Sequence, residues 1–272
     1  MAKATGPSAP WNEIGLSEDP AVELLERFGY THVSAEDLDR ERASLLDVVL
    51  TTRLEAALKR LNPWLNDGNL QRAIREVTHV PAASLLDANE KLYTTLTRGI
   101  SVTQDLGHGS RGQQVRYFDF VAPRHNDLVV TRQLRIKGAK KHIIPDLVLY
   151  VNGVPLAVIE CKSPTIGEKW EHEAIDQLLR YQELAEKYRD LGAPRLFHSV
   201  QLCVATCLQD AVYGTVATPE RFYLRWKEPW PHELAAIEKQ LGRRATPQDV
   251  LFYGMLTPEA LHALARPFMV FD

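Results

Sequence analysis

The stretch Pro145-Asp-Leu-Val-Leu-Tyr-Val-Asn-Gly-Val-Pro-Leu-Ala-Val-Ile-Glu-Cys-Lys162 decides the fold. Two apolar runs flank Asn152-Gly153, a dipeptide typical of tight turns between antiparallel strands. The first run begins with Asp146, and the second ends with Glu160 and Lys162. Charges beside a dry sheet are costly unless they are paired, hydrated or bound to metal. The stretch therefore predicts a β-hairpin with three charged side chains at its open end.

The connection between the two strands decides whether these charges share a face. Glu160 and Lys162 are two residues apart, so both point to the same side of a strand. A two-residue turn with no other bulge places Asp146 on the opposite face. A three-residue loop, Val151–Gly153, places Asp146 diagonal to Glu160 on the same face, with backbones roughly 7–8 Å apart. Because Gly153 suits the left-handed position of such a loop, we predict the three-residue loop.

Two carboxylates on one face suit a hard cation such as Mg²⁺, which prefers oxygen ligands. A bound metal polarises a phosphate oxygen and lowers the pKa of its water. Lys162 could orient or deprotonate that water and offset charge on a phosphorane-like transition state. The backbone carbonyl of Cys161 is a natural further ligand. This interpretation, a metal-dependent nuclease site, competes with a plain one, because Glu-x-Lys pairs also occur on solvated strands and Asp146 could merely begin a strand.

The bulk composition restricts the setting of such a site. The 272 residues are 45% hydrophobic and 25% charged, which is enough for a substantial core. A net charge of −3 gives no overall basic field, so DNA binding would depend on local patches. Three cysteines without a CxxC pattern argue against a disulfide framework or zinc site and favour a reducing cytoplasm. The sequence shows neither a signal peptide nor a run of about 18 apolar residues, so we expect no membrane association.

Periodicity divides the chain into helices, then a sheet, then further helices. Helices are expected over 18–28, 45–61, 67–77, 83–97, 168–191, 232–241, 247–254 and 258–265. Besides the hairpin, strands are expected over 100–104, 114–121, 128–136 and 202–206, with 221–226 as an edge strand or loop. This order predicts an α/β fold with a core sheet of four to six strands and helical additions at both ends.

The residues resemble a known family, the N-terminal region of the R (restriction) subunit of type I restriction-modification enzymes. That region is a nuclease of the PD-(D/E)xK superfamily, whose Asp…Glu-x-Lys motif corresponds here to Asp146, Glu160 and Lys162. The family's Gln-x-x-x-Tyr motif corresponds to Gln177 and Tyr181. Family-like segments follow one another in order over 42–63, 85–89, 114–127, 151–160, 221–226 and 255–272. The two departures near the motif, Ile144 for arginine and Cys161 for leucine, remove no charged group.

The resemblance implies a restriction-endonuclease-like α/β fold, with a central mixed β-sheet flanked by helices and extra helices at both ends. It implies a flexible leader over 1–16, a nuclease domain with an N-terminal helical part over 17–230, and a helical extension over 231–272 leading toward an absent helicase motor. The sequence contains no P-loop motif, so ATP would act only through that motor.

The resemblance also implies a function. It is a Mg²⁺-dependent endonuclease, with Mn²⁺ as a substitute, that cuts double-stranded DNA in a prokaryotic, cytoplasmic, ATP-dependent complex with modification and specificity subunits. Because a separate subunit reads the sequence, this domain should contact phosphates rather than base edges. Two alternatives stay open. A catalytically weak DNA-binding or docking module is disfavoured by the intact acidic and lysine residues, and a standalone repair-type nuclease by the family-like C-terminal end.

Residues from two expected helices are further candidates for the site. The superfamily often adds a glutamate from the first helix, for which Glu18 is the best match and Glu23 the second, although each could be a solvated helix residue. Gln177 and Tyr181 share one helix face, where they could contact DNA, support the lysine and phosphate, or simply pack.

The connector 135–142 is basic and follows the expected strand 128–136. Its Lys140 and Lys141 could contact DNA phosphates, and a solvated charge run is an equal alternative.

Overall fold

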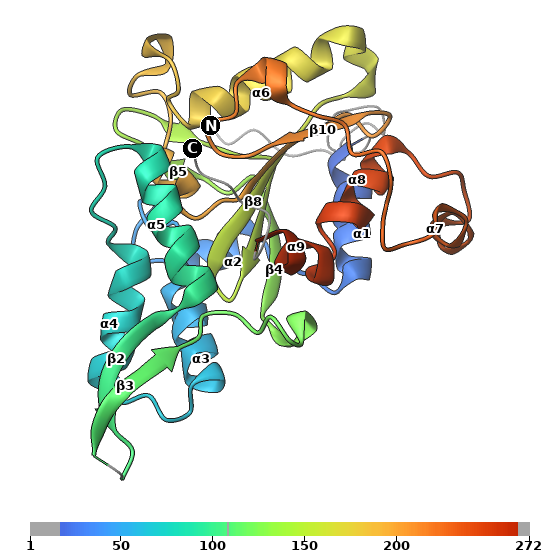
Figure 1. The fold of residues 1–272 in the computed structure, drawn as a ribbon. Coiled ribbons are helices and arrows are strands. Elements are labelled where there is room, and N and C mark those ends of the chain that lie inside the picture. The colour runs from blue at the N-terminus through green and yellow to red at the C-terminus, as the bar shows by residue number, and fades with distance from the viewer. Residues whose placement is uncertain (1–16, 108, 266–272) are drawn as a thin grey trace.

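A six-stranded mixed sheet forms the centre of the computed structural model, which describes residues 17–107 and 109–265 (Figure 1). The leader predicted over 1–16 and the end of the predicted C-terminal extension lie outside the described residues. In sheet order the strands are β1 (Thr31–His32), β4 (Leu128–Arg132), β7 (Leu147–Val151), β8 (Val154–Cys161), β9 (Leu202–Thr206) and β10 (Ala211–Gly214). β1 is parallel to β4 and β8 to β9, and the other neighbours are antiparallel.

The two central strands explain why their sequence is almost continuously apolar. Every residue of β7 and of β8 is buried. Strands covered on both faces have no solvent side, so they lack the alternation of a half-exposed strand. A charged residue at the end of such a strand therefore lies beside a dry core.

Nine described helices surround the sheet. They are α1 (Asp19–Phe28), α2 (Ala35–Glu41), α3 (Thr51–Leu61), α4 (Asp67–Thr78), α5 (Leu85–Arg98), α6 (Trp170–Tyr181), α7 (Leu234–Leu241), α8 (Pro247–Met255) and α9 (Pro258–Ala265). In Figure 1, α3, α4 and α5 lie to one side of the sheet, and α1, α8 and α9 lie to the other. Measured over the described residues, none of these helices has the length and apolarity needed to cross a bilayer.

Two small ribbons and several short helical turns complete the structure. The ribbon of β2 (Ile100–Asp105) and β3 (Ser110–Val115) reaches away from the body in Figure 1. A second ribbon pairs β5 (Ile136–Lys137) with β6 (His142–Ile143). The 3₁₀ turns span Pro123–His125, Pro164–Lys169, Glu186–Tyr188, Pro194–His198 and Glu220–Phe222.

The predicted mixed α/β core is confirmed, but several predicted elements are too long. The helix expected over 45–61 begins only at Thr51, because the backbone N–H of Leu50 donates to Gly153 of the hairpin turn instead. The helix expected over 168–191 ends at Tyr181, since Glu183 has a left-handed φ of 58°. In each case a constraint on one residue overrides the helical pattern around it.

Two predicted strands are also corrected. The strand expected over 128–136 ends at Arg132, and the left-handed Gln133, with a φ of 51°, follows it. The strand expected over 114–121 ends at Val115 and begins earlier, at Ser110. The possible edge strand over 221–226 is reduced to one bridge, between Leu224 and Tyr213.

The predicted three-residue hairpin loop is wrong. Val151 pairs with Val154, so the turn contains only Asn152 and Gly153. Both have positive φ, 50° and 78°, as a type I′ turn requires. The Asn152 side chain donates to Tyr117 O at 2.8 Å and accepts from the Asp127 N–H at 2.8 Å, which secures the shorter turn.

The missing offset is supplied by a bulge along the hairpin. Tyr150 pairs with Pro155, but the next residue pair is Leu149 with Ala157, so Leu156 is the extra residue. Proline has no N–H for a regular ladder, and bulges are one of the positions where strands tolerate it. The two-residue turn and this bulge together bring Asp146 to the face of Glu160.

The turn glycine gives a test of this packing. A β-carbon at Gly153 would lie 2.4 Å from Leu50 O and 2.9 Å from Leu54 N, at a φ of +78°. Gly153→Ala is therefore expected to lower the free energy of unfolding by about 2–4 kcal/mol, from strain and overpacking together. Gly242→Ala is the control, because its φ is +68° and no heavy atom lies within 4 Å of the added carbon. Equal losses for both variants in urea unfolding would contradict the packing argument.

Candidate active site

The register of the hairpin places Asp146 and Glu160 side by side. Leu147 pairs with Ile159, so the preceding Asp146 faces Glu160 across the two strands. Asp146 is 7% exposed and Glu160 is fully buried. The backbone N–H of Cys161 donates to Asp146 Oδ2 at 2.8 Å. The two acidic groups are therefore directly opposite one another rather than diagonal.

Lys162 completes the predicted trio. Its Nζ lies 3.1 Å from Glu160 Oε1 and 3.3 Å from the carbonyl oxygen of Cys161. Its backbone N–H donates to Thr206 O at 2.8 Å, which fixes the end of β8 against β9. The side chain is 12% exposed, so the ammonium lies at the border between the buried carboxylate and solvent.

The predicted helical pair also reaches this site. Gln177 Nε2 donates to Glu160 Oε1 and, at 2.5 Å, to the Tyr181 hydroxyl. Tyr181 in turn donates to Ile144 O at 3.1 Å, two residues before Asp146. The two side chains therefore link α6 to the start of β7 and the end of β8. The contact seen here is to Glu160, which was not among the partners expected for this pair.

The electrostatics of Glu160 are unfavourable for a carboxylate standing alone. Burial, and next the neighbouring Asp146, raise the pKa of Glu160 well above its usual value, while Lys162 acts in the opposite direction. Glu160 Oε2 is buried and has no hydrogen-bond partner among the described residues. A buried acidic pair with one oxygen left over has the character of a cation site.

Glu18 lies beside the pair, at the start of α1, and is 2% exposed. Its Oε1 accepts from Gln133 Nε2 at 3.1 Å, and the same nitrogen donates to Asp146 Oδ1 at 2.9 Å. Glu23, the second match, is exposed instead. Sequence reasoning missed Gln133, because it lies in a stretch that reads as a strand and belongs to no motif; the polar pair Arg132-Gln133 is its only signal.

The fit of a metal ion depends on two carboxylates rather than three. Across residues 17–107 and 109–265, no group of three or more His, Cys, Asp and Glu residues is arranged to hold a metal. Asp146 and Glu160 with the Cys161 carbonyl nevertheless fit Mg²⁺, which accepts few protein oxygens and keeps several waters. The amide of Gln133 bridges Glu18 to this pair.

The two predicted basic residues lie on the ribbon of β5 and β6. Lys140 and Lys141 are both exposed in its turn. Lys140 forms an ion pair with Asp190 at 2.6 Å. An exposed ion pair of this kind is worth little to stability and can be exchanged for another anion.

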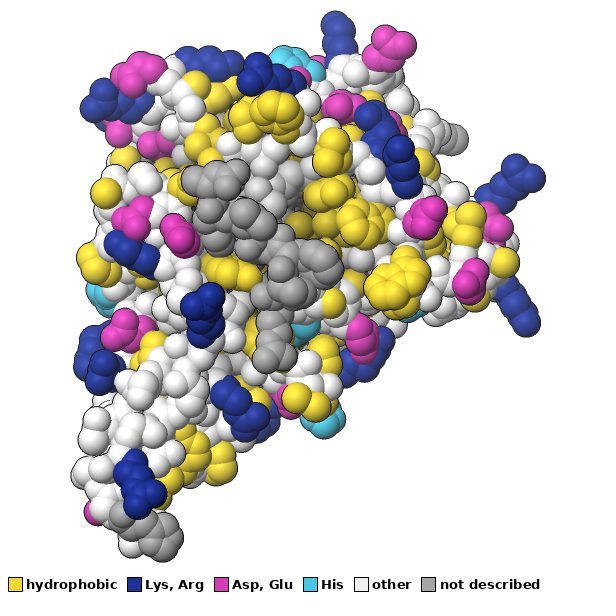
Figure 2. Space-filling view, in the orientation of Figure 1, with side chains coloured by type: hydrophobic (Ala, Val, Ile, Leu, Met, Phe, Trp, Pro, Cys, Tyr) yellow, Lys and Arg dark blue, Asp and Glu magenta, His cyan; other side chains and the backbone are white. Residues whose placement is uncertain are grey.

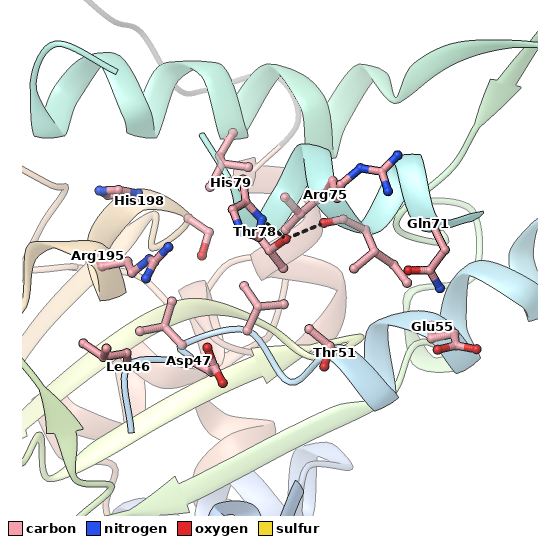
Figure 3. A pocket seen from close by; sticks show the side chains of 16 residues that line it. Leu46, Asp47, Thr51, Glu55, Gln71, Arg75, Thr78, His79, Arg195 and His198 are labelled. Atoms are coloured by element: carbon pink, nitrogen blue, oxygen red, sulfur yellow. Dashed lines mark hydrogen bonds between the residues drawn. The ribbon is translucent and has the colours of Figure 1, made fainter. Parts of the chain in front are cut away.

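Two hollows lie elsewhere on the molecule. One, of about 490 Å³, is lined by aliphatic as well as polar and charged side chains, and Figure 3 shows Arg75 and His79 across it from Arg195 and His198. The other, of about 560 Å³, is mainly apolar and includes Trp226, Trp230 and Met255. Figure 2 shows hydrophobic side chains gathered over the α8–α9 side of the molecule. The described residues lining both hollows do not include the acidic pair or the lysine.

The protein has a mixed sheet flanked by helices, and an acidic pair and a lysine lie at the end of two central strands. This arrangement is that of a restriction-endonuclease-like fold. The family described as type I restriction enzyme R protein N terminus matches residues 10–222, and the chain belongs to it.

Relatives with known names agree with this assignment. The chain is 25% identical to the putative type I restriction enzyme MjaIXP endonuclease subunit of Methanocaldococcus jannaschii, over 97% of this chain and 26% of that protein. It is 27% identical to the type I restriction enzyme HindI endonuclease subunit of Haemophilus influenzae, over 94% of this chain and 24% of that protein. The chain thus spans about a quarter of the length of these relatives.

Proposed function

We propose that this chain is a Mg²⁺-dependent endonuclease domain that hydrolyses phosphodiester bonds of double-stranded DNA. The observation that carries the proposal is the buried, face-to-face pair of Asp146 and Glu160 with Lys162 at 3.1 Å from Glu160. Its family and the names of its relatives, which are endonuclease subunits, support the same activity.

Each residue has a proposed task. Asp146, Glu160 and the carbonyl of Cys161 hold the metal, and Glu18 is a further candidate ligand. The metal, when bound, supplies Lewis acidity toward the phosphate and lowers the pKa of water. Lys162 orients or deprotonates the attacking water and offsets developing charge on the phosphate. Gln177 and Tyr181 hold Glu160 in place through the contacts described above. Lys140 and Lys141 contact phosphates, which positions DNA without reading its bases.

The proposal extends to the larger assembly. We place the nuclease unit over 17–230 and a helical extension over 231–272. The unit acts with modification and specificity subunits of a type I restriction complex in a prokaryotic cytoplasm, and ATP enters only through a motor region outside this chain. The names of the relatives, endonuclease subunits of type I restriction enzymes, support a complex of several subunits. The three cysteines, buried and free, suit a reducing compartment.

Metal binding tests the proposal without requiring cleavage. Calorimetric titration of the chain with Mn²⁺ is expected to show binding that Asp146→Ala weakens at least about 10-fold, since a direct ligand matters at least as much as the residues around it. Glu36→Ala is the control, because it removes an equally charged but exposed acid, paired with Arg40 on α2. Equal Mn²⁺ affinity for the parent chain and Asp146→Ala would overturn the proposed site.

A further inference from the structure

Gln133 is joined to Asp146 at two points. Its backbone N–H donates to Asp146 O at 3.0 Å, and its side-chain Nε2 donates to Asp146 Oδ1 at 2.9 Å. The same amide reaches Glu18 Oε1 at 3.1 Å. Gln133 is itself exposed, whereas both acids are buried. The residue therefore covers the acids from the solvent side and contributes little to the packing of the core.

The backbone of Gln133 is held in an unusual conformation. Its φ of 51° is left-handed, a region that glycine adopts freely and that glutamine rarely adopts. Such an outlier persists when the surroundings hold it, and it often marks a functional position. Here it ends β4 and turns the side chain toward Asp146 and Glu18.

Arg132, the residue before Gln133, also binds the start of α1. Arg132 Nη1 donates to Asp19 Oδ1 at 2.5 Å, and Gln133 binds the adjacent Glu18. Two successive residues at the end of β4 thus bind two successive residues at the start of α1. The position of Glu18 relative to Asp146 is set by this double contact.

A neutral donor is well suited to this position. An amide can donate two hydrogen bonds without adding charge, so it orders two acids and leaves their negative field available for a cation. A lysine in the same place would cancel that field. Glu160 has an equivalent partner, because Gln177 donates to it from α6. Each of the two facing acids therefore accepts a hydrogen bond from one neutral side-chain amide, and Glu160 also contacts a cation, Lys162.

We propose that Gln133 is a positioning residue for metal binding, holding the Asp146 carboxylate in the orientation that a divalent cation needs. The inference rests on the proposed function, because it presumes that Asp146 binds metal. Gln133 acts through Asp146 and Glu18, and its removal should weaken metal binding without unfolding the chain.

Gln133→Gly separates positioning from a structural role, because it relieves the left-handed backbone while removing the amide. Ala217→Gly is the matched control, since Ala217 has a φ of 64° and does not contact the acids. We expect both variants to unfold thermally at or above the temperature of the parent chain. Calorimetry with Mn²⁺ should show affinity about 10–100-fold lower for Gln133→Gly, the range for residues that orient ligands, and parental for Ala217→Gly.

Asp146→Ala, titrated in parallel, distinguishes the two possible failures. If Asp146→Ala loses Mn²⁺ binding and Gln133→Gly binds as the parent does, Gln133 is only a turn residue and the inference is overturned. If the parent chain and Asp146→Ala behave alike, the proposed function fails and the inference with it. A loss of thermal stability in Gln133→Gly would also contradict the inference, because it would show that the side chain supports the fold.

Discussion

Lys162→Ala is expected to lower DNA cleavage by about 10²–10³-fold in an assembled restriction complex, while ATP-driven translocation continues unchanged. The reason is the place of the ammonium, 3.1 Å from Glu160 Oε1 and 12% exposed. It lies at the border between the buried acids and solvent, where the proposed mechanism has water and phosphate approach. Under the proposed mechanism, its removal takes away a preorganised positive group that would stabilise charge as it develops on the phosphate.

Two assays on the same preparation make this test decisive. Cleavage of supercoiled DNA reports the nuclease, and displacement of a DNA-bound triplex strand reports translocation. Lys59→Ala is a suitable control, because Lys59 is an exposed lysine of α3 paired with Glu55. Cleavage that persists in Lys162→Ala would refute the nuclease assignment. Loss of both activities would instead indicate a docking role, the alternative that the sequence left open.

The acidic and lysine residues could be found from sequence because their signal is local. Charged residues at the ends of an apolar run can be recognised from sequence alone, and so can the i, i+4 spacing of Gln177 and Tyr181. The structure brings these five residues into one cluster. The register that does so was harder to predict, since Asn-Gly favours one turn and Pro155 favours a bulge beside it. The offset was expected in the turn and is found at Leu156.

Other features depend on contacts between distant segments. The helix expected over 168–191 ends at Tyr181, where Gln182 accepts from the Ala217 N–H at 2.9 Å. The pattern beyond Tyr181 gives no sign of this contact. Gln133 is a similar case, because its two acidic partners are distant from it in sequence. The residues around it give no sign of its left-handed backbone either. The periodicity of a sequence predicts which face of a helix or strand is buried. It does not predict the distant residue whose contact ends that helix or strand.

Glu160→Gln is expected to stabilise the fold while abolishing cleavage. Burial and Asp146 disfavour the charged form of Glu160, raising its pKa, and the variant carries no such charge. Relief of a buried charge that is only partly compensated should raise the free energy of unfolding at neutral pH, without divalent metal, by about 1–3 kcal/mol.

The local hydrogen bonds favour the amide in this variant. Gln177 and Lys162 both donate to Oε1, and an amide oxygen can accept from both. Oε2 is buried, lacks a hydrogen-bond partner in the described part of the chain, and would be replaced by a donor facing Asp146. The substitution thus turns a repulsive contact between two acids into a hydrogen bond. It also removes one of the two carboxylates proposed to hold the metal.

Stability and metal binding should therefore move in opposite directions in one variant. Urea unfolding in EDTA measures the first, and calorimetry with Mn²⁺ measures the second, for which we expect affinity at least about 10-fold lower. Gln177→Ala is informative beside it, because it removes a donor to Glu160 and should lower stability instead. A less stable Glu160→Gln variant would show that the carboxylate serves the fold. The expected pair of results, higher stability and weaker metal binding in Glu160→Gln, would show that the Glu160 carboxylate serves metal binding at a cost to the stability of the fold.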